Sequence, residues 1–335
     1  MGVVPLNRRR FLQGSLAMTG LGLVSGCGLP SLPWQQPAKV PRIGYIWNGP
    51  VSPTFTSLKD AFVDGMRDLG YVEDQTFVLE VRRASGDGNL VEIMAELVSL
   101  QPDAIVVPAV PEGRALRAVT TTIPIVSAGA FDLVTSGLAA SLARPGGNVT
   151  GLSTPLLARK QLELLKAAAP TVSRVVTVLE TSRVAELEAE AHEAAARSLG
   201  LELWITGVDD PAALESFFEV AVRGGANGVY VVPSPFTSAN QAKIAEFATL
   251  HRLPAIAQQS DAAHLGQLLS YGPDRAVLHR RAATYVDRIL KGAKPADLPI
   301  EQPTVFNFGI NLKTAEALGL TIPATVLAQA TVIIQ

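Results

Sequence analysis

The residue types that most often carry catalysis or hold metal ions are scarce in this chain. Its 335 residues include one cysteine and four histidines. A single cysteine excludes a disulfide framework and a multi-cysteine zinc site, and the wide spacing of the histidines disfavours a histidine metal centre. The sequence contains no GxxxxGKS/T phosphate loop, no GxSxG nucleophile elbow and no HExxH zinc helix. We therefore expect a protein with no cofactor and no metal that is not an enzyme.

The four histidines occupy positions typical of surface residues. His192 lies among charged residues of a helical pattern, and His279 adjoins Arg280, so both are expected on solvated faces. His251 ends a helical pattern, where a cation complements the helix dipole. His264 is nearest a strand end, but no partner for catalysis lies close to it in the sequence.

The cysteine stands at a position that indicates export. Residues 8–10 are three arginines, and residues 11–26 form an apolar run of sixteen residues, shorter than the roughly 20 that span a bilayer. The arginine cluster resembles a twin-arginine export motif, and the small residues before Cys27 resemble a lipobox. We expect residues 1–27 to be a lipoprotein signal and Cys27 to be lipidated, with the proline-rich residues 28–41 as a tether to the membrane.

Composition limits the remaining choices. The chain is 48% hydrophobic and 17% charged, with a mean hydropathy of +0.27, which rules out a disordered chain. Its formal charge of −2 shows no basic surplus for nucleic acid, and removal of residues 1–27 would make the charge −5. The length is typical of about two domains.

From residue 42 onward, short apolar runs alternate with helical patterns. Strands are expected at 43–47, 77–81, 104–108, 125–128 and 149–152, with helices at 55–69 and 90–100. The pattern restarts with strands expected at 174–179, 201–208, 228–232, 255–257 and 268–271, and helices at 160–169, 184–199, 211–223, 237–251 and 274–290. Continuous apolar strands alternating with helices predict an α/β fold with parallel sheets in two successive units. An eight-fold barrel of parallel strands is the alternative architecture.

Several runs, in order, resemble one known family. They are LGYVE at 69–73, SLARPGGNVTG at 141–151, SYGPD at 270–274, RAATYVD at 281–287, NLKTA at 311–315 and LGLTIP at 318–323. Together they are similar to the substrate-binding proteins of ABC transporters. The resemblance implies a type I periplasmic-binding-protein fold, in which two Rossmann-like lobes with parallel sheets are joined by a hinge that the chain crosses three times.

The resemblance also implies boundaries for the lobes. By analogy, the first lobe comprises residues 42–152 and 272–292, and the second comprises 153–271 and 304–335. The crossings then fall near 152–156, 270–273 and 292–304. Some members of the family are linked to aromatic amino acids.

Candidate ligand-binding residues follow the strands, because ligands of open α/β sheets bind outside the carboxyl ends of the strands. Ser52 and Thr54 precede or begin a helix, where hydroxyl and backbone N–H groups bind an anion or simply cap the helix. Asp132 is a candidate partner for a ligand ammonium, with capping as the alternative, and Glu112 is a first-turn acid. The first-lobe candidates are Trp47, Asn48, Ser52, Thr54, Pro111, Glu112, Phe131 and Asp132.

The second-lobe candidates are also polar or aromatic residues at strand ends. Tyr271 is expected either to stack on a ligand ring or to pack in the hinge. Three runs at ligand-facing positions depart from the family pattern. The resemblance therefore implies the fold of the family but does not identify the ligand. The second-lobe candidates are Ser153, Thr154, Glu180, Thr181, Ser234, Phe236 and Tyr271.

These observations predict an exported, lipid-anchored, monomeric protein that binds a small organic solute, with an amino acid among the candidates, and delivers it to an ABC permease. Two alternatives remain open. A sensory module presenting its ligand to a receptor would use the same lobe closure. A secreted α/β enzyme would need a paired nucleophile and base at the strand ends.

Overall fold

The computed structural model describes residues 39–49, 51, 53–84, 89–181 and 189–335. The chain divides into a unit of residues 1–39 and a unit of residues 40–335, and every described helix and strand belongs to the second unit. The predicted export signal, Cys27 and almost all of the predicted tether lie outside the described residues, as does Ser52.

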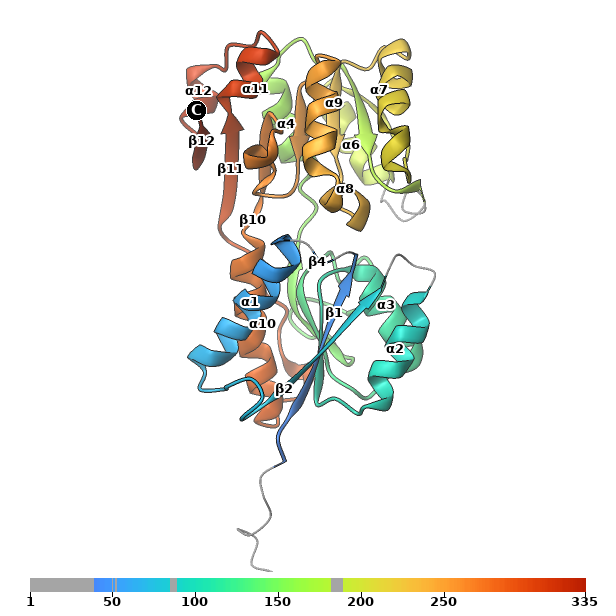
Figure 1. The fold of residues 1–335 in the computed structure, drawn as a ribbon, viewed down its shortest axis with the longest axis vertical. Coiled ribbons are helices and arrows are strands. Elements are labelled where there is room, and N and C mark those ends of the chain that lie inside the picture. Colours follow the sequence, from blue (N-terminus) through green and yellow to red (C-terminus); the bar gives the residue numbers. More distant parts are fainter. Residues whose placement is uncertain (1–38, 50, 52, 85–88, 182–188) are drawn as a thin grey trace, which may run out of the picture. The chain divides into compact units, whose positions relative to one another are not determined.

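The amino-terminal sheet has five parallel strands in the order β2-β1-β3-β4-β5. Alternate residues of β1 face opposite sides, so that Tyr45 packs in one buried cluster and Ile46 in another. Helices cover both faces, which explains why the strands are apolar throughout. The strands are β1 (Arg42–Asn48), β2 (Val78–Ala84), β3 (Ala104–Val107), β4 (Ile125–Phe131) and β5 (Val149–Thr154), and the helices are α1 (Pro53–Asp68), α2 (Leu90–Ser99), α3 (Val110–Val119) and α10 (Arg275–Leu290) (Figure 1).

The carboxyl-terminal sheet has seven strands in the order β12-β11-β10-β9-β8-β6-β7. Its strands are β6 (Arg174–Val178), β7 (Glu202–Trp204), β8 (Gly228–Val231), β9 (Ala255–Ala257), β10 (Leu269–Pro273), β11 (Phe306–Asn311) and β12 (Val332–Ile334). The helices that pack on it are α4 (Ala158–Ala168), α6 (Ala189–Ser198), α7 (Leu214–Arg223), α8 (Pro235–Ala239), α9 (Gln241–Leu250), α11 (Leu312–Ala317) and α12 (Ala324–Leu327). The described residues also include the short 3-10 helices η2 (Pro211–Ala213), η3 (Ala262–Leu265) and η4 (Pro295–Asp297).

The chain passes between the two sheets three times (Figure 1). It leaves the first sheet after β5 and begins α4 at Ala158, and it returns directly from β10 into α10. The carboxylate of Asp274 caps α10 by accepting hydrogen bonds from the backbone N–H groups of Ala276 and Val277. Helix α10 then packs against α1 of the first sheet, before residues 291–305 lead back to β11. We refer to the first sheet with α1, α2, α3 and α10 as the first lobe, and to the rest as the second lobe.

The prediction of two α/β lobes with parallel sheets is confirmed, and the barrel alternative is wrong because the strands form two separate sheets. Two details differ. Strand β11 runs antiparallel to β10, because the chain re-enters the second lobe from the hinge side. The helix expected at 237–251 is two helices that meet at Asn240, since Ser234 and Thr237 form a capping box that starts a short helix at Pro235.

Candidate ligand-binding site

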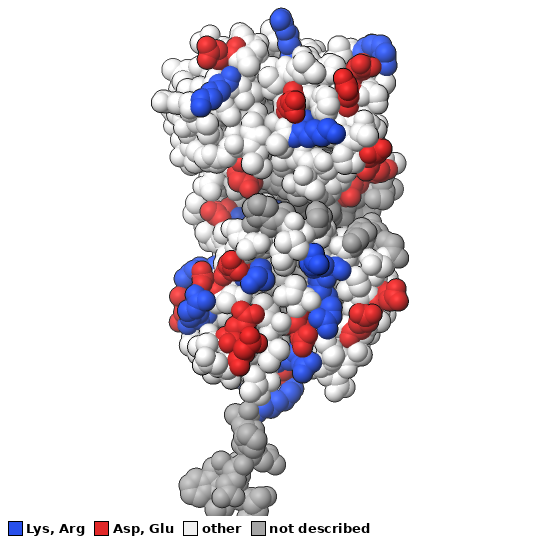
Figure 2. All heavy atoms as spheres, viewed as in Figure 1, with Lys and Arg blue, Asp and Glu red and all other residues white. Residues whose placement is uncertain are grey.

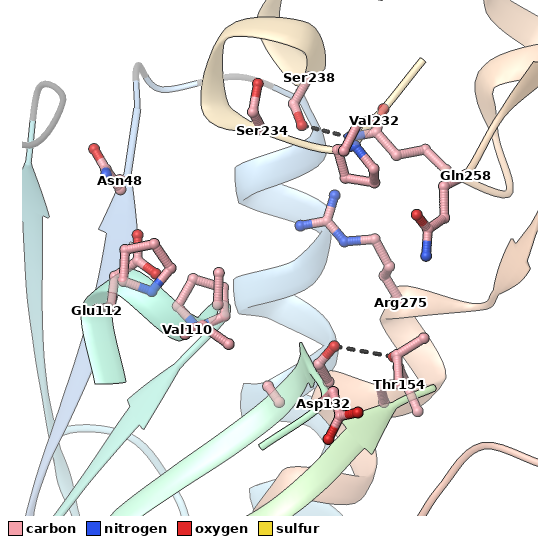
Figure 3. Close-up of a pocket in the computed structure, with 18 of the residues that line it drawn as sticks. Asn48, Val110, Glu112, Asp132, Thr154, Val232, Ser234, Ser238, Gln258 and Arg275 are labelled. Carbon is pink, nitrogen blue, oxygen red and sulfur yellow. Dashed lines mark hydrogen bonds between the residues drawn. The ribbon is translucent and has the colours of Figure 1, made fainter. Parts of the chain in front are cut away.

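A cavity of about 360 Å³ lies at the carboxyl ends of the strands and is lined by residues of both lobes. The first lobe supplies the ends of β1, β4 and β5 and the starts of α3 and α10, and the second lobe supplies the ends of β8 and β9 and part of α8. Figure 3 shows polar side chains entering this space from several of these elements. Parallel strands place their carboxyl ends at one edge of a sheet, which is why residues far apart in sequence meet here.

Eight of the predicted residues line this cavity. Ser234 has its hydroxyl engaged in capping α8, while the hydroxyl of Thr154 donates to the backbone oxygen of Gly129 at 3.0 Å. Thr54 lies inside α1 rather than at its cap, because the helix begins at Pro53. The eight are Trp47, Asn48, Thr54, Pro111, Glu112, Asp132, Thr154 and Ser234.

Five predicted residues are absent from the described wall of the cavity. Tyr271 stacks on Phe306 with ring centroids 5.7 Å apart, which is the hinge-packing alternative. Phe236 is buried in the second-lobe core. The hydroxyl of Ser153 accepts a hydrogen bond from the backbone N–H of Leu133. The other two are Glu180 and Thr181, and of Phe131 only the backbone is described.

Arg275 and Trp47 form the most distinctive contact of the cavity. The Arg275 guanidinium lies over the Trp47 ring, 5.9 Å from its centroid, and Phe55 supports that ring from α1 with centroids 5.4 Å apart. Arg275 is the first residue of α10, directly after the strand that leaves the second lobe. The second hinge crossing therefore places the Arg275 cation in the cavity wall, where its guanidinium packs over the Trp47 ring.

The charge of Arg275 has no anion beside it among the described residues. No ion pair or hydrogen bond joins its guanidinium to any of them, and in Figure 3 its side chain points into the cavity. Burial lowers the pKa of Arg275, and the field of Asp261 partly opposes this effect. Arg275 is partly buried, so its guanidinium loses part of its hydration without gaining an acceptor, and an anionic ligand would offset this loss with charge-assisted hydrogen bonds.

Two carboxyl groups also line the cavity, and they differ in position. Asp132 accepts hydrogen bonds from the backbone N–H groups of Val134 and Thr135 and from the Thr135 hydroxyl. It therefore stabilises the turn after β4, as the capping alternative predicts. Glu112, in the first turn of α3, is 1% exposed, and Figure 3 shows it across the cavity from Arg275.

His279 was expected on a solvated face, and that prediction is wrong. Its side chain is buried and borders the cavity, and its Nδ1 lies 2.8 Å from the Tyr45 hydroxyl oxygen. Burial, assisted by the nearby positive charge of Arg275, lowers the pKa of His279 to about 3. The imidazole is therefore neutral at physiological pH, and burial also raises the pKa of Tyr45.

His192 is likewise buried instead of exposed, and it also lines the cavity. Its ring lies 6.0 Å from that of Tyr230. The spacing of residues along each helix could have predicted that both histidines are buried. His279 precedes Ala282 and Ala283 by three and four residues, and His192 precedes Ala196 by four, so each shares a face with buried alanines.

Other cavity residues come from sites that sequence patterns could not single out. Arg114, Ser238, Gln258 and Gln259 all line the cavity, together with Arg275. Gln258 and Gln259 follow β9, and Arg114 and Ser238 lie within short helices. Polar residues are common at such positions, so the sequence does not distinguish these four. Only the pairing of strands across the second sheet and the passage of the chain through the hinge bring them to one space.

None of the described helices is long and apolar enough to cross a membrane.

Comparison with known proteins assigns the chain to a family. The family described as ABC transporter substrate binding protein matches residues 51–334. A tyrosine-binding protein of Clostridioides difficile (strain R20291) is 25% identical over 270 residues, which cover 80% of this chain and 78% of that protein.

Two solved structures share the fold and about a quarter of the sequence. One is an ABC domain from Streptococcus pneumonia in complex with L-Trp, with a TM-score of 0.80 and 26% identity over 88% of this chain and 99% of that chain. The other is a conserved domain protein from Vibrio cholerae, with a TM-score of 0.81 and 26% identity over 88% of this chain and 100% of that chain. This chain, with its cavity between two α/β lobes, belongs to the ABC transporter substrate binding protein family.

Proposed function

We propose that this protein is the extracytoplasmic substrate-binding component of an ABC importer and that its substrate is an α-amino acid or a close analogue with a free carboxylate. Membership of the family supports the transport role. Two relatives, one a tyrosine-binding protein and one in complex with L-Trp, support an amino acid.

The Arg275 guanidinium carries this proposal. It enters the cavity with no anion beside it among the described residues, on a wall that otherwise includes proline, valine, leucine and alanine side chains. A carboxylate accepts two parallel hydrogen bonds from a guanidinium, and this pairing is strong in a site withdrawn from water. An uncharged sugar or a free amine would leave the cation without its counter-charge.

The rest of the cavity suits the other groups of an amino acid. The buried carboxyl of Glu112 lies across from Arg275 and is our candidate for the ligand ammonium. Trp47 offers an apolar face for a side chain. A zwitterion would thus meet a cation and an anion on opposite walls.

We further propose that Cys27 carries a lipid that holds the protein at the outer face of the membrane, with residues 28–41 as the tether. Anchoring raises the concentration of the protein near its permease. Closure of the lobes on the ligand would present a distinct surface to that permease, and a monomer suffices for this role. Binding and release require no bond to be made or broken, so we propose no enzymatic activity. A sensory receptor remains the alternative recipient of the closed form.

Arg275→Gln tests the ligand class. We expect L-tryptophan or L-tyrosine to raise the melting temperature of the wild-type protein, because a ligand that binds only the folded state stabilises it. Tryptamine and tyramine, which lack the carboxylate, should not. The substitution should weaken amino-acid binding about 10- to 100-fold in titration calorimetry, since a hydrogen-bonded charge contributes about 1.5–3 kcal/mol.

Arg280→Gln is the matched control, because Arg280 makes ion pairs with Asp64 and Asp68 on the exposed surface, outside the cavity wall. It should leave the affinity unchanged. Equal binding of the amine and the amino acid by the wild-type protein would remove the carboxylate from the proposal.

A further inference from the structure

The side-chain nitrogen of Gln258 is buried and has no hydrogen-bond partner among the described residues. Gln258 follows β9 in the second lobe, is 7% exposed and lines the cavity. Both the burial and the missing partner concern its Nε2, which is a hydrogen-bond donor. A buried donor left unsatisfied costs about 1–3 kcal/mol, so the group calls for an explanation.

The Nε2 donors of neighbouring glutamines do find acceptors in the second lobe, although the Oε1 of Gln267 has none among the described residues. The Nε2 of Gln241 donates to the Oε1 of Gln259, and the Nε2 of Gln259 donates to the Ser238 hydroxyl. The Nε2 of Gln267 lies 3.4 Å from the backbone oxygen of Gln241. Gln258 adjoins this network in sequence but directs its amide elsewhere, into the cavity wall.

Strand register places Gln258 beside Gly272, close to the hinge crossing that leads to Arg275. Strands β9 and β10 are parallel, and Ala257 pairs with Ser270. The backbone oxygen of Gln258 lies so close to Gly272 that a Cβ there would be 1.9 Å from it. Only Pro273 and Asp274 separate this contact from Arg275. Figure 3 shows the Gln258 and Arg275 side chains entering the cavity from the same side.

We propose that Gln258 and Arg275 bind the same carboxylate of the ligand, with Gln258 donating from the second lobe and Arg275 from the first. A carboxylate has about four lone-pair directions, enough for a guanidinium and an amide N–H together. The terminal amide can present its NH₂ group after a simple turn about its last bond. The ligand carboxylate would then link the lobes across the hinge, and Gln258 would select for an acid. This inference rests on the proposed function, whose carboxylate it places.

Gln258→Glu tests whether Gln258 recognises the ligand carboxylate. A purely structural role of Gln258 would not change the ratio of acid to amide affinity. The probes are L-tryptophan with L-tryptophanamide and L-tyrosine with L-tyrosinamide, measured by titration calorimetry. A carboxylate at position 258 repels a ligand carboxylate but accepts hydrogen bonds from a ligand amide. We expect acid affinity to fall at least 100-fold while amide affinity changes less than 10-fold, so that the ratio of acid to amide affinity falls at least 10-fold.

Two further variants separate charge and folding from recognition. Gln329→Glu adds the same charge at an exposed position outside the cavity and should leave the ratio unchanged. Gln258→Leu removes the donor at similar volume and should weaken acid binding about 10-fold, with an unliganded melting temperature no lower than that of the wild type.

The outcomes distinguish the two proposals. If the wild type binds an acid but Gln258→Glu shows the same ratio of acid to amide affinity, the role of Gln258 is overturned. The proposed ligand class would still stand in that case. A wild-type protein that binds none of the acids would overturn the proposed ligand class, and the assignment of Gln258 with it.

Discussion

Arg275 and His279 lie one helical turn apart on α10, and both border the cavity, yet they carry different charges. Arg275 keeps its proton because its intrinsic pKa is far above neutrality. His279 is neutral because it is buried, hydrogen-bonded to Tyr45 and close to the Arg275 charge. The start of α10 therefore presents a single cation to the cavity, suited to one ligand carboxylate.

The neutral state of His279 predicts acid sensitivity of folding. The pKa of His279 is about 3 in the folded protein, whereas an unperturbed histidine has a pKa of about 6.5. Between these values the unfolded chain binds the proton first, so the free energy of unfolding falls as the pH drops. His279→Gln should reduce the loss of stability between pH 7 and pH 5 by about 2 kcal/mol, measured by urea unfolding.

His264→Gln provides the comparison, because His264 is exposed. It should leave the loss between pH 7 and pH 5 as large as in the wild type. If His279→Gln showed that same loss, the imidazole would not be held neutral in the folded protein.

At the scale of elements, the packing of α1 against α10 ties the hinge to the first sheet. The two helices approach closely at Gly65, where a Cβ would lie 2.4 Å from the backbone oxygen of Arg280 and 2.9 Å from the Cβ of Ala283. Only glycine permits this distance. The contact fixes α10 on the first lobe while Asp274 caps its start, and together they orient Arg275 toward the cavity.

Gly65→Ala should destabilise the protein. Alanine favours a helix by about 1 kcal/mol over glycine, but overpacking against rigid backbone typically costs about 1–3 kcal/mol, and here the clash involves a carbonyl group. We expect a net loss of about 1–2 kcal/mol in the free energy of unfolding, measured in urea. Gly147→Ala, where a Cβ would meet open space, should change it by less than about 0.5 kcal/mol. A stabilising Gly65→Ala would contradict the close packing of these helices.

At the scale of the whole molecule, two sheets that are each complete share one cavity at their strand ends. Neither lobe alone holds the wall that we assign to the ligand, because Arg275 and Glu112 belong to the first lobe and Gln258 to the second. On the face in Figure 2, acidic and basic side chains are interspersed, in keeping with a small-solute ligand rather than nucleic acid.

Cys27→Ala tests the proposed anchor. Expressed in a bacterium that processes lipoproteins, the wild-type chain should sediment with the membrane fraction and gain the mass of a lipid at its new amino terminus. The variant should lack that lipid mass while binding the same ligand with unchanged affinity, since residue 27 lies outside the unit that holds the cavity. Membrane-bound wild type without any lipid mass on Cys27 would contradict the assignment.

The sequence by itself determined most of the strands and helices up to residue 290, since periodicity and breakers such as Pro170 act locally. It did not predict α3 or the elements after α10, where the apolar patterns are short. Strand ends also pointed to eight cavity residues, among them Trp47 and Glu112, because parallel strands deliver their carboxyl ends to one edge. Only the tertiary structure decided that Arg275 and Gln258 line the same cavity and that His279 is buried. Their positions depend on strand register and on a hinge crossing, which are contacts between distant segments that no local pattern encodes.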